Sequence, residues 1–162
     1  MFVDFDTLPA DAKIWVYQAD RRLNDTELES LGSRFRIFSD SWDSHGKNLR
    51  NSFRFFHNYF IVIGVDENYT TASGCSIDKS VDLIRKTEQE FMVNFLDRSR
   101  IAFEIDNVIQ QYSFNNLKMY INNQTIRPEN LMFNNTVATM DEFRKKWKIP
   151  AGETWISKYF NK

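Results

Sequence analysis

The stretch Phe53-Arg-Phe-Phe-His-Asn-Tyr-Phe-Ile-Val-Ile-Gly-Val65 decides the fold class, because it is the strongest β-forming segment of the chain. Apolar and aromatic side chains recur at every second position, which is the period of a β-strand. Phe60 and Val62 make its second half apolar on both faces, as in a strand at the centre of a sheet. We therefore predict one long central strand over residues 53–65.

The segment before this strand predicts a strand and a helix. Ile14 to Tyr17 is short, β-branched and aromatic, which is typical of a buried strand. Asn24 and Glu27 have the spacing of a capping box, and apolar residues at helical spacing follow them. We expect this helix to end at His45-Gly46, because glycine readily adopts the left-handed conformation that closes a helix.

The segment after the strand completes the pattern. A polar loop leads into an amphipathic helix near Ser73, and strands over 101–105 and 108–112 flank the hairpin signal Asp106-Asn107. Beyond residue 113 the pattern is helical. The order βαβαββα plus a C-terminal helical tail predicts an α+β fold with an α/β-like mixed sheet, in a single domain over residues 1–162.

Composition and charge limit the partners that we expect. The 162 residues include 15 Phe, 6 Tyr and 4 Trp but only 5 Gly and 3 Pro, which excludes a disordered chain. The net charge is −1, with −3 over residues 1–81 and +2 over 82–162, so we expect no nucleic-acid partner. We interpret the basic run at 144–148 as a complement to the dipole of a helix. No apolar run reaches the length of a membrane span, so we expect no membrane partner.

The turn before the second helix is the segment most suited to chemistry. It reads Ser73-Gly74-Cys75-Ser76-Ile77-Asp78-Lys79 and joins the strongest strand to an amphipathic helix. Free N–H groups at a helix start favour an anion, and glycine lets the backbone pass close to a ligand. The candidate ligand-binding residues are Ser73, Gly74, Ser76, Asp78 and Lys79.

Cys75 is the candidate nucleophile and His45 its candidate base. The field of a helix start favours a thiolate, which is the nucleophilic form of cysteine. The alternative for Cys75 is a small buried side chain that only packs, and the alternative for His45 is a helix cap. The sequence leaves open whether the two side chains meet.

Several familiar sites are absent from the sequence. There is no Cys-x-x-Cys pair, and Val81 stands where a Cys-x5-Arg phosphatase loop requires arginine. Gly46-Lys47 lacks the first glycine and the hydroxyl of a nucleotide-binding phosphate loop, which speaks against an ATPase. One Cys and two His cannot build a closed zinc site, so we expect neither a metal nor a cofactor.

Three segments resemble an uncharacterised bacterial family of cytoplasmic proteins of about this length. They are Ser73-Gly74-Cys75-Ser76-Ile77-Asp78, Trp42-Asp43-Ser44-His45-Gly46 and Phe133-Asn134-Asn135. Some members are labelled "ABC transporter ATPase", although this chain lacks the phosphate loop of such enzymes. The resemblance implies a stand-alone, single-domain cytoplasmic protein in which the turns at Cys75 and His45 are the segments of interest. A lone cysteine without an export signal also fits the cytoplasm.

Three interpretations of function remain open. The first is a binding or interaction domain that recognises a small anionic ligand or a protein partner at Ser73–Lys79. The second is a thiol-dependent enzyme with Cys75 as nucleophile, His45 as base, and Ser73, Ser76 and backbone N–H groups holding an oxyanion. The third is a structural subunit whose many aromatic side chains form an interface between copies of the chain.

Overall fold

The computed structural model describes residues 1–160 and divides the chain into two compact units. The first comprises residues 1–96 and 137–143, and the second comprises residues 97–136 and 144–162. Helices and strands occur in both units, so the α+β class is confirmed. The expectation of a single domain over residues 1–162 stays a prediction.

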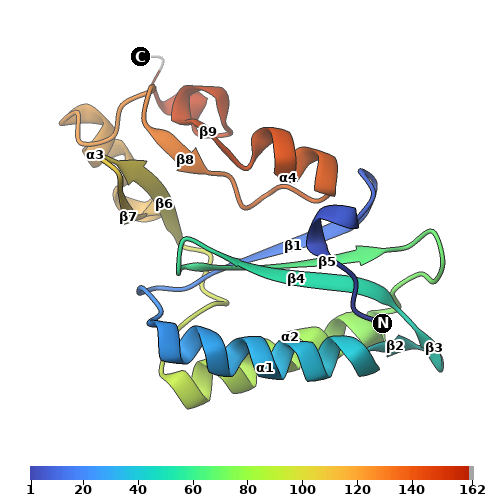
Figure 1. Ribbon diagram of the computed structural model, residues 1–162. Helices are drawn as coiled ribbons and strands as arrows, with labels where there is room; N and C mark the ends of the chain where they lie inside the picture. The colour runs from blue at the N-terminus through green and yellow to red at the C-terminus, as the bar shows by residue number, and fades with distance from the viewer. Residues whose placement is uncertain (161–162) are drawn as a thin grey trace. The chain divides into compact units, whose positions relative to one another are not determined.

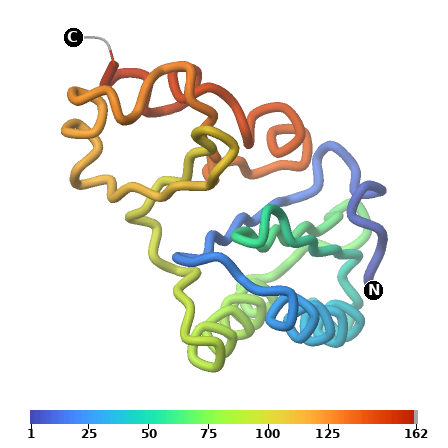
Figure 2. Tube along the Cα trace, turned by 60° about the vertical axis from the view of Figure 1, so that its left-hand side comes forward, coloured from blue at the N-terminus to red at the C-terminus, as the bar shows by residue number. Residues whose placement is uncertain are grey.

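The first unit is a three-stranded antiparallel sheet with two helices on one face (Figures 1 and 2). The strand order is β1-β5-β4, so β5 is central and β4 lies at an edge. The helices α1 and α2 lie side by side beneath the sheet in both views. The elements are β1 (Lys13–Gln18), α1 (Asp25–Ser41), β2 (Asp43–Ser44), β3 (Lys47–Asn48), β4 (Arg50–Phe56), β5 (Phe60–Asp66) and α2 (Gly74–Phe91).

The prediction of one long strand over residues 53–65 is wrong, because this segment folds back on itself as the β4–β5 hairpin. His57 and Asn58 have φ angles of 54° and 61°, and the Tyr59 N–H donates to the Phe56 carbonyl at 3.1 Å. Two consecutive residues with positive φ make the tight turn that suits the twist of antiparallel strands. The predicted apolar centre is nevertheless correct, since all of β5 is buried.

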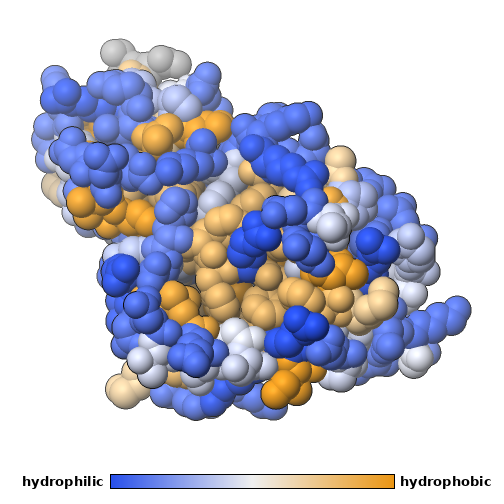
Figure 3. All heavy atoms as spheres, in the orientation of Figure 1, coloured by the Kyte–Doolittle hydropathy of each residue, from blue (hydrophilic) through white to orange (hydrophobic). Residues whose placement is uncertain are grey.

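An apolar core between the sheet and the helices stabilises the first unit. Most side chains of the edge strand β4 are only partly buried, and Figure 3 shows apolar surface over this strand. Phe53 and Phe55 nevertheless pack on Phe35 of α1, with ring centroids 5.4 Å and 6.1 Å away. The buried members of the core include Leu31, Phe35, Trp42, Leu49, Ile61, Ile63, Val65 and Ile84.

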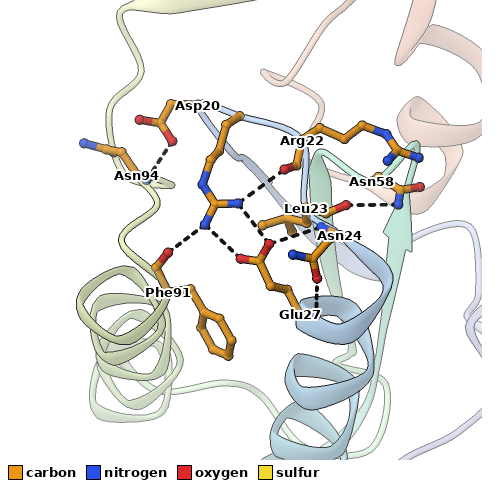
Figure 4. A network of polar contacts seen from close by, with 9 residues as sticks. Asp20, Arg22, Leu23, Asn24, Glu27, Asn58, Phe91 and Asn94 are labelled. Carbon is orange, nitrogen blue, oxygen red and sulfur yellow. Dashed lines mark hydrogen bonds and ion pairs between the residues drawn. The ribbon is translucent and has the colours of Figure 1, made fainter.

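A polar network ties the start of α1 to the end of α2 (Figure 4). The predicted capping box is present: Asn24 accepts from the Glu27 N–H at 2.8 Å, and Glu27 accepts from the Asn24 N–H at 3.2 Å. Arg21 donates to both Glu27 oxygens, at 3.0 Å and 2.8 Å, and to the Phe91 carbonyl at 2.6 Å. This contact holds the pKa of Glu27 below its ordinary value, chiefly through the hydrogen bond from Arg21.

The prediction that His45-Gly46 closes the first helix is also wrong. The helix ends at Ser41, and His45 and Gly46, with φ angles of 52° and 78°, form the turn between β2 and β3. Asp43 accepts a hydrogen bond from the Gly46 N–H at 3.0 Å and closes this turn. A glycine at positive φ is common to helix ends and tight hairpins, so the local sequence does not separate the two.

The second unit contains a four-stranded antiparallel sheet in the order β7-β6-β8-β9. The hairpin predicted at Asp106-Asn107 is confirmed, with φ angles of 52° and 62°. The C-terminal part differs from the helical tail that we predict, because two strands of three residues each lie within it. The elements are β6 (Arg100–Ile105), β7 (Val108–Ser113), α3 (Leu117–Asn122), β8 (Leu131–Phe133) and β9 (Lys148–Pro150), with short 3-10 helices at Phe114–Asn116, Ala151–Glu153 and Ser157–Tyr159.

The helix α4 (Met140–Lys146) starts in the first unit, where residues 138–140 cover the free edge of β1. The Ile14 N–H donates to the Ala138 carbonyl at 2.9 Å, and the Met140 N–H donates to the Ala12 carbonyl at 2.9 Å.

Over the residues that the structure describes, no helix has the length and apolar character needed to span a membrane.

Candidate functional site

Ser73 is the N-cap of α2. Its Oγ accepts a hydrogen bond from the Ser76 N–H at 3.2 Å and lies 2.7 Å from the Ser76 Oγ. An N-cap oxygen satisfies one of the backbone donors that a helix start leaves free. Both hydroxyls that we consider for anion binding are therefore engaged within the protein.

The turn at residues 42–46 lies against the start of α2. Trp42 Nε1 donates to the Ser76 carbonyl at 2.8 Å, and Ser76 Oγ donates to the Asp43 carbonyl at 2.9 Å. Lys79 Nζ lies 2.8 Å from Asp43 Oδ1. The structure thus brings together the two segments that we consider for chemistry, although they are far apart in the sequence.

Asp43 organises the charges at this junction. Its pKa lies below the ordinary value, first because Lys79 donates a hydrogen bond to the carboxylate and second because the Gly46 N–H does so. The lowered pKa means that the carboxylate stays ionised in acid that would protonate a free aspartate. The pair with Lys79 is lost only as the pH falls through that lowered pKa.

The remaining predicted residues lie at the surface. Cys75 is an exposed free thiol, which contradicts its interpretation as a buried packing residue. His45 and Asp78 are exposed as well, and within residues 1–160 no hydrogen bond joins Cys75 to His45. A side chain at Gly74 would meet nothing within 4 Å, so the packing of the protein does not require glycine there.

A groove of about 350 Å³ begins at Lys79 and runs between α1 and α2. Phe38, Trp42 and Leu83 supply its apolar side chains, and Trp42 stacks on Phe38 with ring centroids 5.0 Å apart. Its charged and polar lining consists of Ser41, Asp43, Lys79, Asp82 and Lys86. An apolar floor with a few charged groups at the rim is typical of small-molecule sites.

Of these lining residues, only Lys79 is predicted from the sequence as a binding residue. Phe38 and Trp42 fit the apolar stripe of the first helix, and Leu83 and Lys86 are ordinary residues of an amphipathic helix. No motif marks the groove, because it depends on how α1 and α2 pack.

Within the described part of the chain, no group of three or more His, Cys, Asp or Glu side chains could hold a metal ion.

No protein-family model matches this chain, and no curated protein or solved structure was found to be similar to it.

Proposed function

We propose that the chain is a binding domain that takes a small ligand with an apolar body and an anionic group, in the groove between α1 and α2. The observation that carries the proposal is the groove itself, about 350 Å³ in volume, which starts at the first turns of α2 and combines aromatic and aliphatic side chains with Lys79 and Lys86. The chain contains a single cysteine, which suits a reducing compartment, and we place the domain in the cytoplasm.

Lys86 and Lys79 have different roles in this proposal. Lys86 is exposed and forms no ion pair within residues 1–160, so its ammonium can meet an anion directly. Lys79 already contacts Asp43, and an incoming anion therefore competes with that carboxylate. Asp43 acts as an internal substitute for the anionic group of the ligand.

Binding of anilinonaphthalene sulfonate, which carries an apolar ring system and a permanent negative charge, tests this arrangement by fluorescence titration. We expect Lys86→Ala to weaken binding by about two- to fivefold, as loss of an exposed charge contact predicts. Asp43→Asn should strengthen it by about threefold, because an amide still accepts from Gly46 but competes poorly for Lys79. Lowering the pH through the depressed pKa of Asp43 should act in the same direction as Asp43→Asn.

Lys47→Ala is the matched control, since Lys47 is an exposed lysine on β3 outside the groove. Its affinity for the probe should equal that of the unmodified protein. Equal losses in Lys47→Ala and Lys86→Ala would indicate a general charge effect and would refute the groove as the binding site.

A thiol-dependent enzyme is a second candidate, favoured by one specific observation. The Trp42–Ser76, Ser76–Asp43 and Lys79–Asp43 contacts hold the turn that carries His45 against the start of α2. Cys75 is the second residue of α2, and its thiol is exposed. In this arrangement Cys75 acts as the nucleophile and His45 as its base. The backbone N–H groups of Gly74 and Cys75 are the remaining donors for an oxyanion, because the hydroxyls are engaged.

The rate of Cys75 alkylation by iodoacetamide against pH tests this candidate. In the unmodified protein we expect alkylation at neutral pH, because the thiolate is the reacting form of cysteine, and a clear slowing in His45→Ala. His57→Ala is the matched control, because His57 is the other histidine and also lies in a hairpin turn with positive φ. A thiol that reacts only above about pH 8.5 in all three proteins would exclude catalysis by Cys75.

A further inference from the structure

The two units carry opposite charge, which the net charge of −1 conceals. The second unit contains ten Lys and Arg against five Asp and Glu, and the first contains eleven against seventeen. The second unit is built from two separate stretches of sequence, so a division at residue 81, which gives −3 and +2, shows only part of this asymmetry. Our expectation of no nucleic-acid partner rests on whole-chain charge, and that basis does not apply to the second unit alone.

Three aromatic side chains form a platform at the surface of the second unit. Phe114 and Trp155 are each 41% exposed, and their ring centroids lie 5.8 Å apart with an angle of 39° between the planes. Tyr159 is half-buried, and its ring centroid lies 6.4 Å from that of Phe114 with an angle of 71° between the planes. Large aromatic side chains are normally buried in a chain of this size, so an exposed and contiguous set points to an interaction.

Two lysines and a hollow adjoin this platform. Lys158 Nζ lies 5.2 Å and Lys118 Nζ 6.0 Å from the centre of the Tyr159 ring, and neither forms an ion pair within residues 1–160. The hollow has a volume of about 350 Å³. It is lined by Phe114, Asn115, Leu117, Lys118 and Tyr159.

We propose that this aromatic platform binds single-stranded nucleic acid. Flat exposed rings stack on unpaired bases, and ammonium groups beside them meet the phosphates; such sites combine stacking with a positive groove. A duplex hides the faces of its bases, so a stacking surface favours a single strand. A neutral sugar would use the rings but not the lysines, whereas an acidic peptide would use the lysines and has few planar groups to stack.

Fluorescence anisotropy of a labelled oligouridylate, titrated with the full chain at several salt concentrations, tests the proposal. Phe114→Ala and Trp155→Ala should each weaken binding by roughly tenfold, the usual effect of removing one stacking side chain. Lys118→Ala and Lys158→Ala should each reduce the slope of log K against log salt by about 0.7. Binding should also quench the fluorescence of Trp155, and Trp155→Phe should remove that quenching.

Tyr69→Ala provides the matched control, because Tyr69 is 71% exposed with Arg50 5.2 Å above its ring but belongs to the acidic first unit. It should bind the oligonucleotide like the unmodified protein. Circular dichroism would show whether loss of an aromatic ring disturbs folding. In that case the two lysine variants still test the proposal, because Lys118 and Lys158 lie at the surface. Absence of binding at low salt would overturn the proposal. Equal affinity for heparin, unaffected by Phe114→Ala, would also overturn it, since a plain cationic patch has no need of the rings.

Discussion

Replacing Trp42 with alanine is expected to lower the free energy of unfolding by about 3–5 kcal/mol, the usual range for truncating a buried tryptophan. Trp42 is 2% exposed and belongs to the core between the sheet and the helices. Truncation leaves a cavity beside Phe38 and removes the donor to the Ser76 carbonyl. Such a loss is a large part of the 5–15 kcal/mol by which native domains are typically stable. Urea unfolding followed by circular dichroism measures it.

Two further variants separate packing from hydrogen bonding at this position. Trp42→Phe keeps an aromatic ring next to Phe38 but lacks the N–H, and we expect a loss of about 1–3 kcal/mol. Trp155→Ala, which removes an exposed tryptophan of the second unit, should cost far less. If Trp42→Ala and Trp155→Ala were equally stable, Trp42 would not be the anchor of the turn at residues 42–46.

The same tryptophan connects the fold to the candidate site. The Trp42 side chain crosses from the end of α1 to the first turn of α2, and the adjacent Asp43 contacts Ser76 and Lys79. The position of the His45 turn is therefore set by core packing as well as by the Asp43–Lys79 ion pair. An exposed ion pair alone contributes little, about 0–1 kcal/mol, and would not fix the turn.

The sequence predicts structure correctly where the signal is local. The capping box at Asn24 and Glu27 and the hairpin turn at Asp106-Asn107 each depend on residues within a few positions, and both are confirmed. The turn at His57-Asn58 has the same backbone conformation but is missed. Aromatic side chains continue at every second position through it, so the period of a strand hides the turn.

The candidate site depends on contacts that no local pattern encodes. Asp43 meets Ser76 and Lys79 only because the sheet and both helices pack into one unit. The groove residues Phe38 and Leu83 are indistinguishable in sequence from other members of an amphipathic face. Likewise, the positive charge of the second unit comes from residues 144–162, with six Lys and Arg against one Glu, whereas residues 97–136 are balanced at four against four.

Gly64→Ala is the second substitution for which we expect a large effect, a loss of about 1–3 kcal/mol through overpacking. Gly64 lies in the central strand β5, and a Cβ there would collide with Leu8 Cδ1 and lie 3.0 Å from Ile14 Cδ1. Both neighbours are buried, so neither can move aside into solvent. The sequence alone shows only a glycine in an apolar strand, which would usually be improved by a side chain.

Gly74→Ala is the matched control, because a Cβ at Gly74, the first residue of α2, would meet nothing within 4 Å. Alanine has the higher helix propensity, so this variant should be at least as stable as the unmodified protein. Combining Gly64→Ala with Leu8→Ala tests the cause, since shortening Leu8 removes the collision. The double variant should be more stable than the two separate losses predict, by about 1 kcal/mol or more. Simple additivity would show that Leu8 is not the obstacle and would leave Ile14, whose Cδ1 lies 3.0 Å from such a Cβ, as the side chain that resists the substitution.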